Sequence, residues 1–271
     1  MTYREICARL TAAGIEDAQN DAAILMAHFG GISASALPYR RDEDVTSAAL
    51  AKAVRRREEH YPLQYLIGVW GFCGQEYEVN EHTLIPRSDT ECLVEEALRR
   101  LPRGAHFADL CTGSGCIAVS TLCMRRDTTA VAVDLFPETL STAERNAVRN
   151  GVSDRVSFLC ADVLKPLPLA EGSLDAILSN PPYIRTEVVA DLAPELAFEP
   201  SAALDGGGDG LDFYRAILEK HVPLLKPDGM LLFEIGYDQA DSLRELASAH
   251  GFACRILRDL GGCDRVAVLT R

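Results

Sequence analysis

The sequence contains no apolar run near the roughly 18 residues that a helix needs to cross a bilayer. Its first ten residues, MTYREICARL, mix charged and apolar side chains and lack the apolar centre of a secretory signal. It also contains no internal repeat and no low-complexity tract. We therefore expect a globular cytoplasmic protein, and 271 residues are enough for one well-buried core and a smaller companion domain.

The nine cysteines form no C-x-x-C pair, and no histidine stands at the spacing of a zinc site. Their odd number also argues against a framework of disulfides. Several lie in apolar stretches, where a free cysteine acts as a small hydrophobic residue. We expect reduced, buried thiols and no metal site.

Positive charge is scarce, because 27 Lys and Arg residues stand against 40 Asp and Glu residues and give a net charge of -13. Such a balance excludes a protein that coats nucleic acid with its whole surface. Basic clusters at 40–41, 55–57 and 99–100 lie in or beside predicted helices, where a solvated helix face is the simpler interpretation. One of them could still touch an RNA-associated partner. We expect a monomer without stable direct nucleic-acid binding and without membrane contact.

The first part of the chain, residues 1–72, has helical patterning and no cluster of reactive side chains. Apolar residues such as Ile6, Leu10 and Leu25 recur at helical spacing, and a further helix is predicted over 48–59. We interpret this part as a small helical domain for substrate recognition.

Residues 73–90 change character. Glycines precede the alternating stretch 76–79, a pattern typical of a β-hairpin, and we interpret 73–90 as a hairpin linker. A helix is predicted over 91–100, with its N-terminal cap at Ser88 or Asp89.

Residues 91–271 alternate short apolar strands with helices such as 115–124 and 137–150. The seven predicted strands cover 106–110, 130–134, 156–160, 174–179, 230–235, 254–258 and 265–270. The alternation predicts an α/β fold with a mostly parallel, seven-stranded sheet that helices cover on both faces. Because only Gly261 and Gly262 join the last two strands, these strands should form an antiparallel hairpin at one edge.

A glycine-containing loop follows the first predicted strand and leads directly into a helix. The loop consists of Cys111, Thr112, Gly113, Ser114 and Gly115. Its glycines allow a ligand to approach the backbone closely, and the start of the helix offers free N–H groups. The loop is neither a complete G-x-G-x-x-G nor a P-loop, so by itself it is also compatible with an ordinary strand-to-helix turn.

The next two strands end in acidic residues. Asp134 stands about 20 residues after the loop, where a carboxylate accepts the hydroxyl hydrogens of a ribose, and it is also placed to cap a helix. The third strand leads to Asp162 and Val163, which could accept from an adenine amino group and pack on its ring. Three suitable strand ends at one edge of a parallel sheet favour a nucleotide-type cofactor over a lone turn.

The fourth strand runs into Asn180, Pro181, Pro182 and Tyr183. Two prolines fix φ and remove backbone donors, so the Asn180 amide oxygen and the Pro181 carbonyl can accept both hydrogens of a planar –NH2 group. Tyr183 offers a flat face to such a group. The arrangement orients the nitrogen towards a methyl on a sulfonium, and no ionised base stands beside it. A plain proline-rich turn is the alternative.

With these segments, the chain resembles the HemK/PrmC family of protein-glutamine methyltransferases over nearly its whole length. The resemblance is carried by LIPRSDTE at 84–91, NPPYI at 180–184, EIG at 234–236 and DLGGCDR at 259–265. The NPPY tetrad alone occurs in other N-methyltransferases, whereas its combination with the other segments is specific.

The resemblance implies a class I, Rossmann-like methyltransferase that binds S-adenosylmethionine through 111–115, Asp134, Asp162, Val163 and Asn180. It also implies that residues 180–183 bind the glutamine of a Gly-Gly-Gln motif in class-1 peptide chain release factors. Two positions depart from the family pattern, because Cys111 replaces a glycine and Val163 replaces a common aromatic residue. Neither change removes a reacting group.

Other functions fit parts of the pattern. A ribosomal-protein glutamine methyltransferase would share the chemistry, whereas a DNA or RNA amino-methyltransferase usually needs a basic reading surface that this acidic chain lacks. A non-catalytic scaffold would keep only the cofactor fold, and nicotinamide-dependent oxidoreduction gives 180–183 no role.

Three features outside the strand ends have two interpretations each. Residues 205–210 form a lid over the substrate or a flexible surface loop. Arg87 positions the substrate or ties the linker to the catalytic domain. Glu199 faces the substrate channel or makes a structural hydrogen bond.

Overall fold

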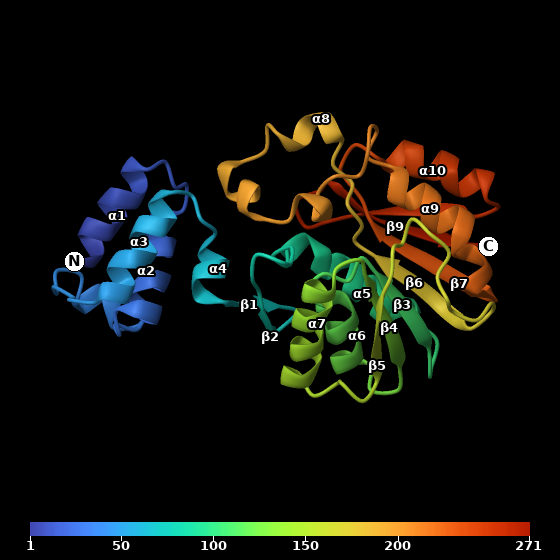
Figure 1. The fold of residues 1–271 in the computed structure, drawn as a ribbon, viewed down its shortest axis with the longest axis horizontal. Helices are drawn as coiled ribbons and strands as arrows, with labels where there is room; N and C mark the ends of the chain where they lie inside the picture. Colours follow the sequence, from blue (N-terminus) through green and yellow to red (C-terminus); the bar gives the residue numbers. More distant parts are fainter. The chain divides into compact units, whose positions relative to one another are not determined.

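The computed structural model describes all residues from Met1 to Arg271, and they divide into two units. One unit consists of Met1–Val69 together with the short segment Ala193–Phe198, and the other consists of Trp70–Leu192 and Glu199–Arg271. Figure 1 labels the helices and strands of both. None of the helices combines the length and the apolar character needed to span a bilayer.

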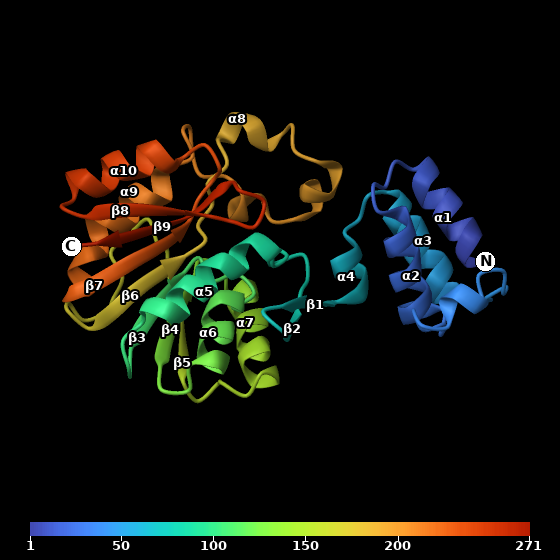
Figure 2. The same ribbon diagram turned by 180° about the vertical axis from the view of Figure 1, so that it is seen from behind.

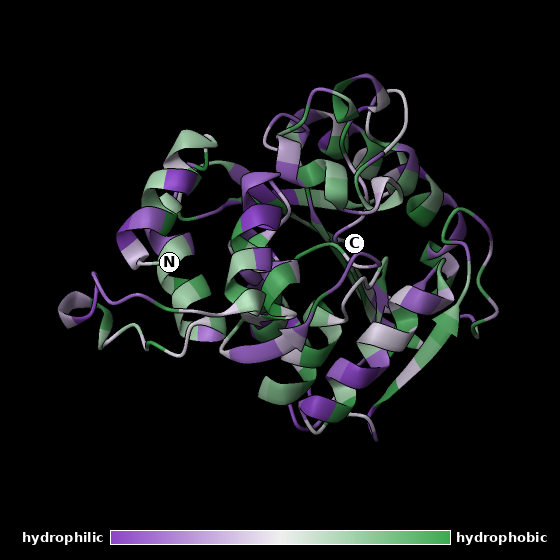
Figure 3. Cartoon of the chain, turned by 60° about the vertical axis from the view of Figure 1, so that its left-hand side comes forward, coloured by the Kyte–Doolittle hydropathy of each residue, from purple (hydrophilic) through white to green (hydrophobic).

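The helical unit is built from α1 (Tyr3–Ala12), α2 (Ala18–Phe29), the 3-10 turn η1 (Leu37–Tyr39), α3 (Ala48–Glu58) and α4 (Leu63–Ile67). A capping box starts α1, in which the Thr2 hydroxyl accepts from the N–H of Glu5 and the Glu5 carboxylate accepts from the N–H of Thr2. The predicted helix over 48–59 is confirmed to within one residue. In Figure 3 the helices carry both hydrophilic and hydrophobic segments, as expected for helices that bury one face.

A two-stranded hairpin, β1 (Val69–Phe72) and β2 (Gln75–Glu78), precedes the main sheet. Its turn residues Cys73 and Gly74 both have positive φ, as the tight turns that match strand twist require. Helix α5 (Glu91–Arg100) follows a 3-10 turn at Ser88–Thr90. The predicted side-chain cap at Ser88 or Asp89 is wrong, because Thr90, directly before α5, already has helical dihedral angles and no side chain caps the helix.

The larger unit contains a seven-stranded sheet in the order β5-β4-β3-β6-β7-β9-β8. The strands are β3 (His106–Leu110), β4 (Thr129–Asp134), β5 (Val156–Cys160), β6 (Leu174–Ser179), β7 (Leu225–Glu234), β8 (Ala253–Arg258) and β9 (Asp264–Thr270). Strands β3 to β7 pair in parallel, and β9 pairs antiparallel with both β7 and β8. The predicted mostly parallel sheet with a C-terminal antiparallel hairpin is therefore confirmed.

Helices cover the sheet on both faces (Figures 1 and 2). On one face lie α5, α6 (Cys116–Met124) and α7 (Pro137–Arg149), and on the other lie α9 (Asp212–Lys220) and α10 (Ala240–Ala249). Successive residues of a strand enter different cores: Phe107 belongs to the α5–α7 side and Ala108 to the α9–α10 side. The buried strands read as continuous apolar runs for this reason.

The order in which the strands are added to the sheet reverses at β3, since β4 and β5 lie on one side of it and β6 and β7 on the other. Open parallel sheets bind ligands at such a switch point, outside the carboxyl ends of the strands. The connection that follows β6 there includes α8 (Thr186–Val189) and the 3-10 turn Ser201–Ala203. Two further 3-10 turns are Pro194–Phe198, in the segment that belongs to the helical unit, and Val222–Leu224, directly before β7.

The nine cysteines are all free thiols, but the expectation that they are buried holds only for Cys116; six are partly exposed and two are exposed. Cys160 and Cys263 are exposed, because Cys160 ends the edge strand β5 and Cys263 lies in the β8–β9 turn. Only Cys116, at the start of α6, is fully buried.

Candidate active site

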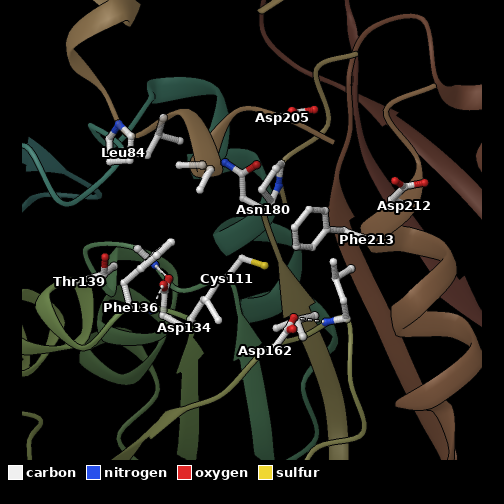
Figure 4. Close-up of a pocket in the computed structure, with 18 of the residues that line it drawn as sticks. Leu84, Cys111, Asp134, Phe136, Thr139, Asp162, Asn180, Asp205, Asp212 and Phe213 are labelled. Atoms are coloured by element: carbon white, nitrogen blue, oxygen red, sulfur yellow. Dashed lines mark hydrogen bonds between the residues drawn. The ribbon is translucent and has the colours of Figure 1, made fainter. Parts of the chain in front are cut away.

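A cavity of about 420 Å³ lies at the carboxyl ends of β3, β4, β5 and β6 (Figure 4). Of the residues predicted for the site, Cys111, Gly113, Asp134, Asp162, Val163, Asn180 and Pro182 line it together. The other predicted residues, Thr112, Ser114, Gly115, Pro181 and Tyr183, do not line the cavity. They shape the two segments that do.

The loop after β3 bends sharply at the floor of the cavity. Cys111 has φ of 60°, a left-handed conformation that is unusual for a residue with a side chain, and its thiol lies among the cavity residues in Figure 4. Gly115 has φ of 80°, and a Cβ there would stand 3.1 Å from the Cβ of Ala143 in α7. Glycine at 115 thus allows α6 and α7 to approach each other beneath the loop.

Asp109 anchors this loop from within the protein. Its Oδ2 accepts hydrogen bonds from the hydroxyl of Thr112 at 2.6 Å and from the N–H of Ala118 at 3.1 Å. Burial raises the pKa of Asp109 to about 7, although these two hydrogen bonds oppose the shift. The buried acid therefore holds the loop to the first turn of α6.

Asp134, at the end of β4, connects the loop to the next strand. Its Oδ2 accepts from the N–H of Gly113 at 3.0 Å, and its Oδ1 accepts from the N–H of Phe136 at 3.3 Å. Burial raises the pKa of Asp134, and the backbone donors partly offset that rise. Each carboxylate oxygen keeps a lone pair for a ligand in the cavity.

The turn after β5 presents Asp162 and Val163 to the cavity. Burial by itself would raise the pKa of Asp162, but the N–H of Leu164 and the ammonium of Lys165 lower it overall. Phe213 of α9 lines the same cavity (Figure 4) and packs against the apolar cluster to which Val163 belongs.

Asn180 points into the cavity from the end of β6 (Figure 4). Its Nδ2 donates to the hydroxyl oxygen of Thr90 at 3.3 Å, which leaves Oδ1 free to accept a hydrogen bond from a ligand. Pro181 and Pro182 are buried, and the Tyr183 hydroxyl donates to Oε1 of Glu234 at 3.4 Å. Burial raises the pKa of Tyr183, so this hydroxyl keeps its proton.

The backbone after Asn180 is held by the glycine-rich segment 205–210. A Cβ on Gly206 would lie 2.7 Å from the carbonyl oxygen of Pro182, and one on Gly210 would lie 2.4 Å from that of Tyr183. The side chain of Gln239 donates to the carbonyls of Tyr183 and Gly210, at 3.1 Å each. The segment therefore packs on the backbone that follows Asn180 through Gly206 and Gly210, whereas Gly208 and Asp209 between them are exposed.

The two open interpretations of Arg87 and Glu199 are also resolved by contacts. The Arg87 guanidinium pairs with Glu199, and the N–H of Ile85 donates to the other oxygen of that carboxylate at 3.0 Å. Glu199 is buried and absent from the cavity lining. Arg87 ties two segments of the larger unit together, and Glu199 makes a structural hydrogen bond.

Several cavity residues were not predicted from the sequence. Phe136 stands two residues after Asp134, so the strand-end argument that selected Asp134 could have included it. Phe213, Pro200 and Asp212 come from segments far along the chain, and no local motif marks them. The hydrogen bond between Asn180 and Thr90 likewise joins residues 90 positions apart.

Comparison with known proteins agrees with this geometry. Residues 2–68 match the family described as PrmC N-terminal domain, and residues 88–232 match the methyltransferase small domain. The release factor glutamine methyltransferase of Geobacter sulfurreducens is 40% identical over 262 residues, which cover 95% of this chain and 91% of that protein. The enzyme of the same name from Moorella thermoacetica is 39% identical over 269 residues, covering 96% and 94%.

A solved methyltransferase from Pyrococcus furiosus shares the fold, with a TM-score of 0.56 at 18% identity over 73% of this chain and 89% of that one. Identity near 40% over almost the full length of curated relatives is a stronger finding than the shared fold. The chain therefore belongs to the release factor glutamine methyltransferase family.

Proposed function

We propose that this protein transfers a methyl group from S-adenosylmethionine to the side-chain amide nitrogen of a glutamine, the one in the Gly-Gly-Gln motif of class-1 peptide chain release factors, in the cytoplasm. Relatives named release factor glutamine methyltransferase support the substrate. The observation that carries the chemistry is Asn180, which faces the cavity while its –NH2 group is bonded to Thr90. Its amide oxygen is then an acceptor for a substrate –NH2.

The cavity suits S-adenosylmethionine in size and in the groups that line it. Its volume of about 420 Å³ lies in the usual range for small-molecule sites. The free lone pairs of Asp134 suit ribose hydroxyls, and Phe136, Val163 and Phe213 supply apolar faces for adenine. When bound, the cofactor supplies an electrophilic methyl group on a positively charged sulfur.

The residues of the chain then have to overcome the low reactivity of an amide nitrogen, whose lone pair is delocalised into its carbonyl. Asn180 Oδ1, which faces the cavity, accepts a hydrogen bond from one N–H group of the glutamine and so fixes the direction in which the nitrogen faces. The carbonyl of Pro181, in the next peptide of the same segment although Pro181 itself does not line the cavity, is the acceptor that we assign to the other N–H group. The anchoring of Tyr183 by Gln239 keeps this backbone from turning. The nitrogen becomes acidic only as its new bond forms, so an ionised base beside Asn180 is not required.

The test is to incubate the protein with purified release factor and S-adenosylmethionine that carries a labelled methyl group, and to locate the label by mass spectrometry. We expect one methyl on the glutamine of the Gly-Gly-Gln motif and none on a release factor in which that glutamine is alanine. Label on a ribosomal protein or on nucleic acid instead would replace the proposed substrate. Cofactor binding without any transfer would favour the non-catalytic scaffold.

The same assay tests Asn180. Removing one oriented hydrogen-bonding group from such a site costs about 100-fold or more in kcat, so Asn180→Ala should lose that much turnover. The matched control is Asn20→Ala, since Asn20 is exposed on α2 of the helical unit. Full activity of Asn180→Ala would remove the basis of the mechanism.

A further inference from the structure

His221 is a buried imidazole beside the cavity that has no place in the mechanism above. It directly follows α9, is 0% exposed and does not line the cavity. Its Nε2 donates a hydrogen bond to the carbonyl oxygen of Val163 at 2.8 Å, whereas its Nδ1 has no partner. A carbonyl oxygen can only accept, so the single N–H of the neutral ring is on Nε2. Burial lowers the pKa of His221 and Lys220 adds to this effect, against the hydrogen bond to Val163, so the ring is neutral at pH 7.

The Val163 carbonyl belongs to a peptide group that also holds Asp162. In the trans peptide between Val163 and Leu164, the C=O and N–H bonds point in opposite directions. The C=O faces His221, and the N–H of Leu164 donates to Oδ1 of Asp162 at 2.9 Å. His221 and Asp162 are therefore hydrogen-bonded to opposite sides of one planar group.

Asp162 is the member of this chain of contacts that reaches the cavity (Figure 4). Its other oxygen, Oδ2, pairs with the ammonium of Lys165 at 3.1 Å, but the Lys165 side chain is 77% exposed. Exposed ion pairs of this kind hold a carboxylate weakly. The direction of the free lone pairs of Asp162 therefore depends mainly on the peptide N–H of Leu164, and so on the position of that peptide.

The main chain fixes His221 on both sides. Its N–H donates to the carbonyl of Ile217 at 2.9 Å in the last turn of α9, and its carbonyl accepts from the N–H of Leu224 at 3.0 Å. The first turn of the same helix supplies Phe213 to the cavity lining. One helix thus reaches the cavity with its first turn and the Asp162 turn with the residue that follows its last turn.

A buried imidazole with an unpartnered nitrogen costs stability, so a side chain of this kind is expected where its hydrogen bond has a use. We propose that His221 is a positioning residue for the cofactor: by holding the peptide between Val163 and Leu164, it directs the Asp162 carboxylate at the 6-amino group of adenine. The inference rests on S-adenosylmethionine as the cofactor of the proposed function. It does not require His221 to touch the ligand.

The first experiment measures binding and needs no methyl acceptor. Calorimetry compares S-adenosylhomocysteine, the cofactor without its methyl group, with S-inosylhomocysteine, in which an oxygen replaces the 6-amino group. The parent should prefer the adenosyl compound by about ten-fold or more, because the inosyl compound offers Asp162 no amino group. In His221→Leu the preference should fall to about three-fold or less, since the peptide is no longer held. His221→Gln, whose Nε2 can replace the lost donor, should keep most of the preference.

Leu218→Ala is the matched control for a loss of stability alone. Leu218 lies on α9, is 1% exposed, and belongs to the same apolar cluster as Val163. Its truncation leaves a cavity and destabilises the fold, but it keeps the bond between His221 and Val163, so the preference should equal that of the parent. An unchanged preference in His221→Leu overturns the positioning role. So does an equal fall in Leu218→Ala, because general loosening of the core would then explain both variants.

The second experiment reads His221 in the parent and does not depend on the folding of a variant without the donor. The chain has six histidines, so ¹⁵N-histidine labelling gives six rings, and the signals missing in His221→Gln are those of interest. At neutral pH we expect an uncharged ring whose Nε2 proton exchanges slowly with water. A charged ring, or a proton on Nδ1, overturns the inference.

The binding data also separate this inference from the proposed function. A parent that binds neither compound overturns both the role of His221 and the proposed cofactor. A parent that shows the expected preference but methylates no release factor contradicts the proposed substrate alone, and the comparison of His221→Leu with His221→Gln then still decides the role of His221.

Discussion

Asp134 accepts, through Oδ2, a hydrogen bond of 3.0 Å from the backbone N–H of Gly113. One carboxylate thereby joins the loop after β3 to the end of β4 and offers its remaining lone pairs to the cavity. Asp134→Ala should weaken S-adenosylmethionine binding by about 10- to 100-fold, because it removes charged hydrogen bonds worth roughly 1.5–3 kcal/mol. Titration calorimetry measures this. Glu138→Gln, an exposed acid in the first turn of α7, is the control and should bind like the parent.

The conformation of Cys111 gives a second prediction. At φ of 60° a side chain costs about 1–2 kcal/mol relative to glycine. Cys111→Gly should therefore be at least as stable as Cys111→Ala, although glycine is normally the weaker of the two. At Cys116, the first residue of α6, φ is not positive, so the order should be the usual one, with the glycine variant less stable than the alanine variant. Denaturant unfolding of the four variants compares the pairs, and the same order at both positions would rule out strain at Cys111.

The sheet could be predicted from the sequence because each of its strands is a short apolar run between turn residues. Strands β3, β5 and β6 agree with the prediction at both ends, and β4, β8 and β9 begin one residue earlier than predicted. Strand β7 begins at Leu225 and not at 230. Residues 226–229, Lys-Pro-Asp-Gly, have the composition of a turn. The pairing of β6 with β7 shifts register between Leu174 and Ala176, and an irregular stretch of this kind tolerates a proline within a strand.

The residues of the site could be predicted from the sequence only where they directly follow strands. Asp134, Asp162 and Asn180 were found because parallel strands end at one edge of a sheet. The roles of Thr90 and Phe213 could not be predicted in this way. They come from other elements, and no local sequence pattern shows that these elements pack beside the strand ends. The same holds for Ala193–Phe198, whose membership of the helical unit rests on contacts 138 residues apart in the chain.

Asp109 leads to a prediction about stability and pH. Its pKa is near 3.8 in an unfolded chain and about 7 in the folded protein, so between these values only the folded state holds the proton. Its contribution to stability is complete below the lower value and is lost as the pH rises through the upper one. From pH 5.5 to 7 the parent should lose about 2 kcal/mol relative to Asp109→Asn. Unfolding at both pH values tests this, with the exposed Asp191→Asn as a control that should follow the parent.

The last prediction concerns a buried ion pair of the helical unit. Arg57 of α3 donates to Asp21 of α2 at 2.6 Å, with side chains 9% and 8% exposed, and also pairs with Glu195 at 3.2 Å. Arg57→Met should destabilise this unit by about 3–5 kcal/mol, because it leaves the Asp21 charge buried without a partner. It should also increase hydrogen exchange across 193–198, since Glu195 is part of that segment and loses a charged contact.

Arg56→Met is the matched control on the same helix. Arg56 pairs with Glu59 at 3.5 Å in an exposed position, stacks over the ring of Tyr61 at 4.0 Å and lies 6.0 Å from the ring centre of Phe198, the outer limit of such a contact. Together these contacts contribute about 1 kcal/mol, so Arg56→Met should change the exchange of 193–198 much less than Arg57→Met. Glu195→Gln should lie between the two, because its carboxylate is 32% exposed and shared between Arg57 and His60. Equal exchange across 193–198 in Arg57→Met and Arg56→Met would mean that the buried pair does not hold the segment, since only Arg57 reaches both Asp21 and Glu195.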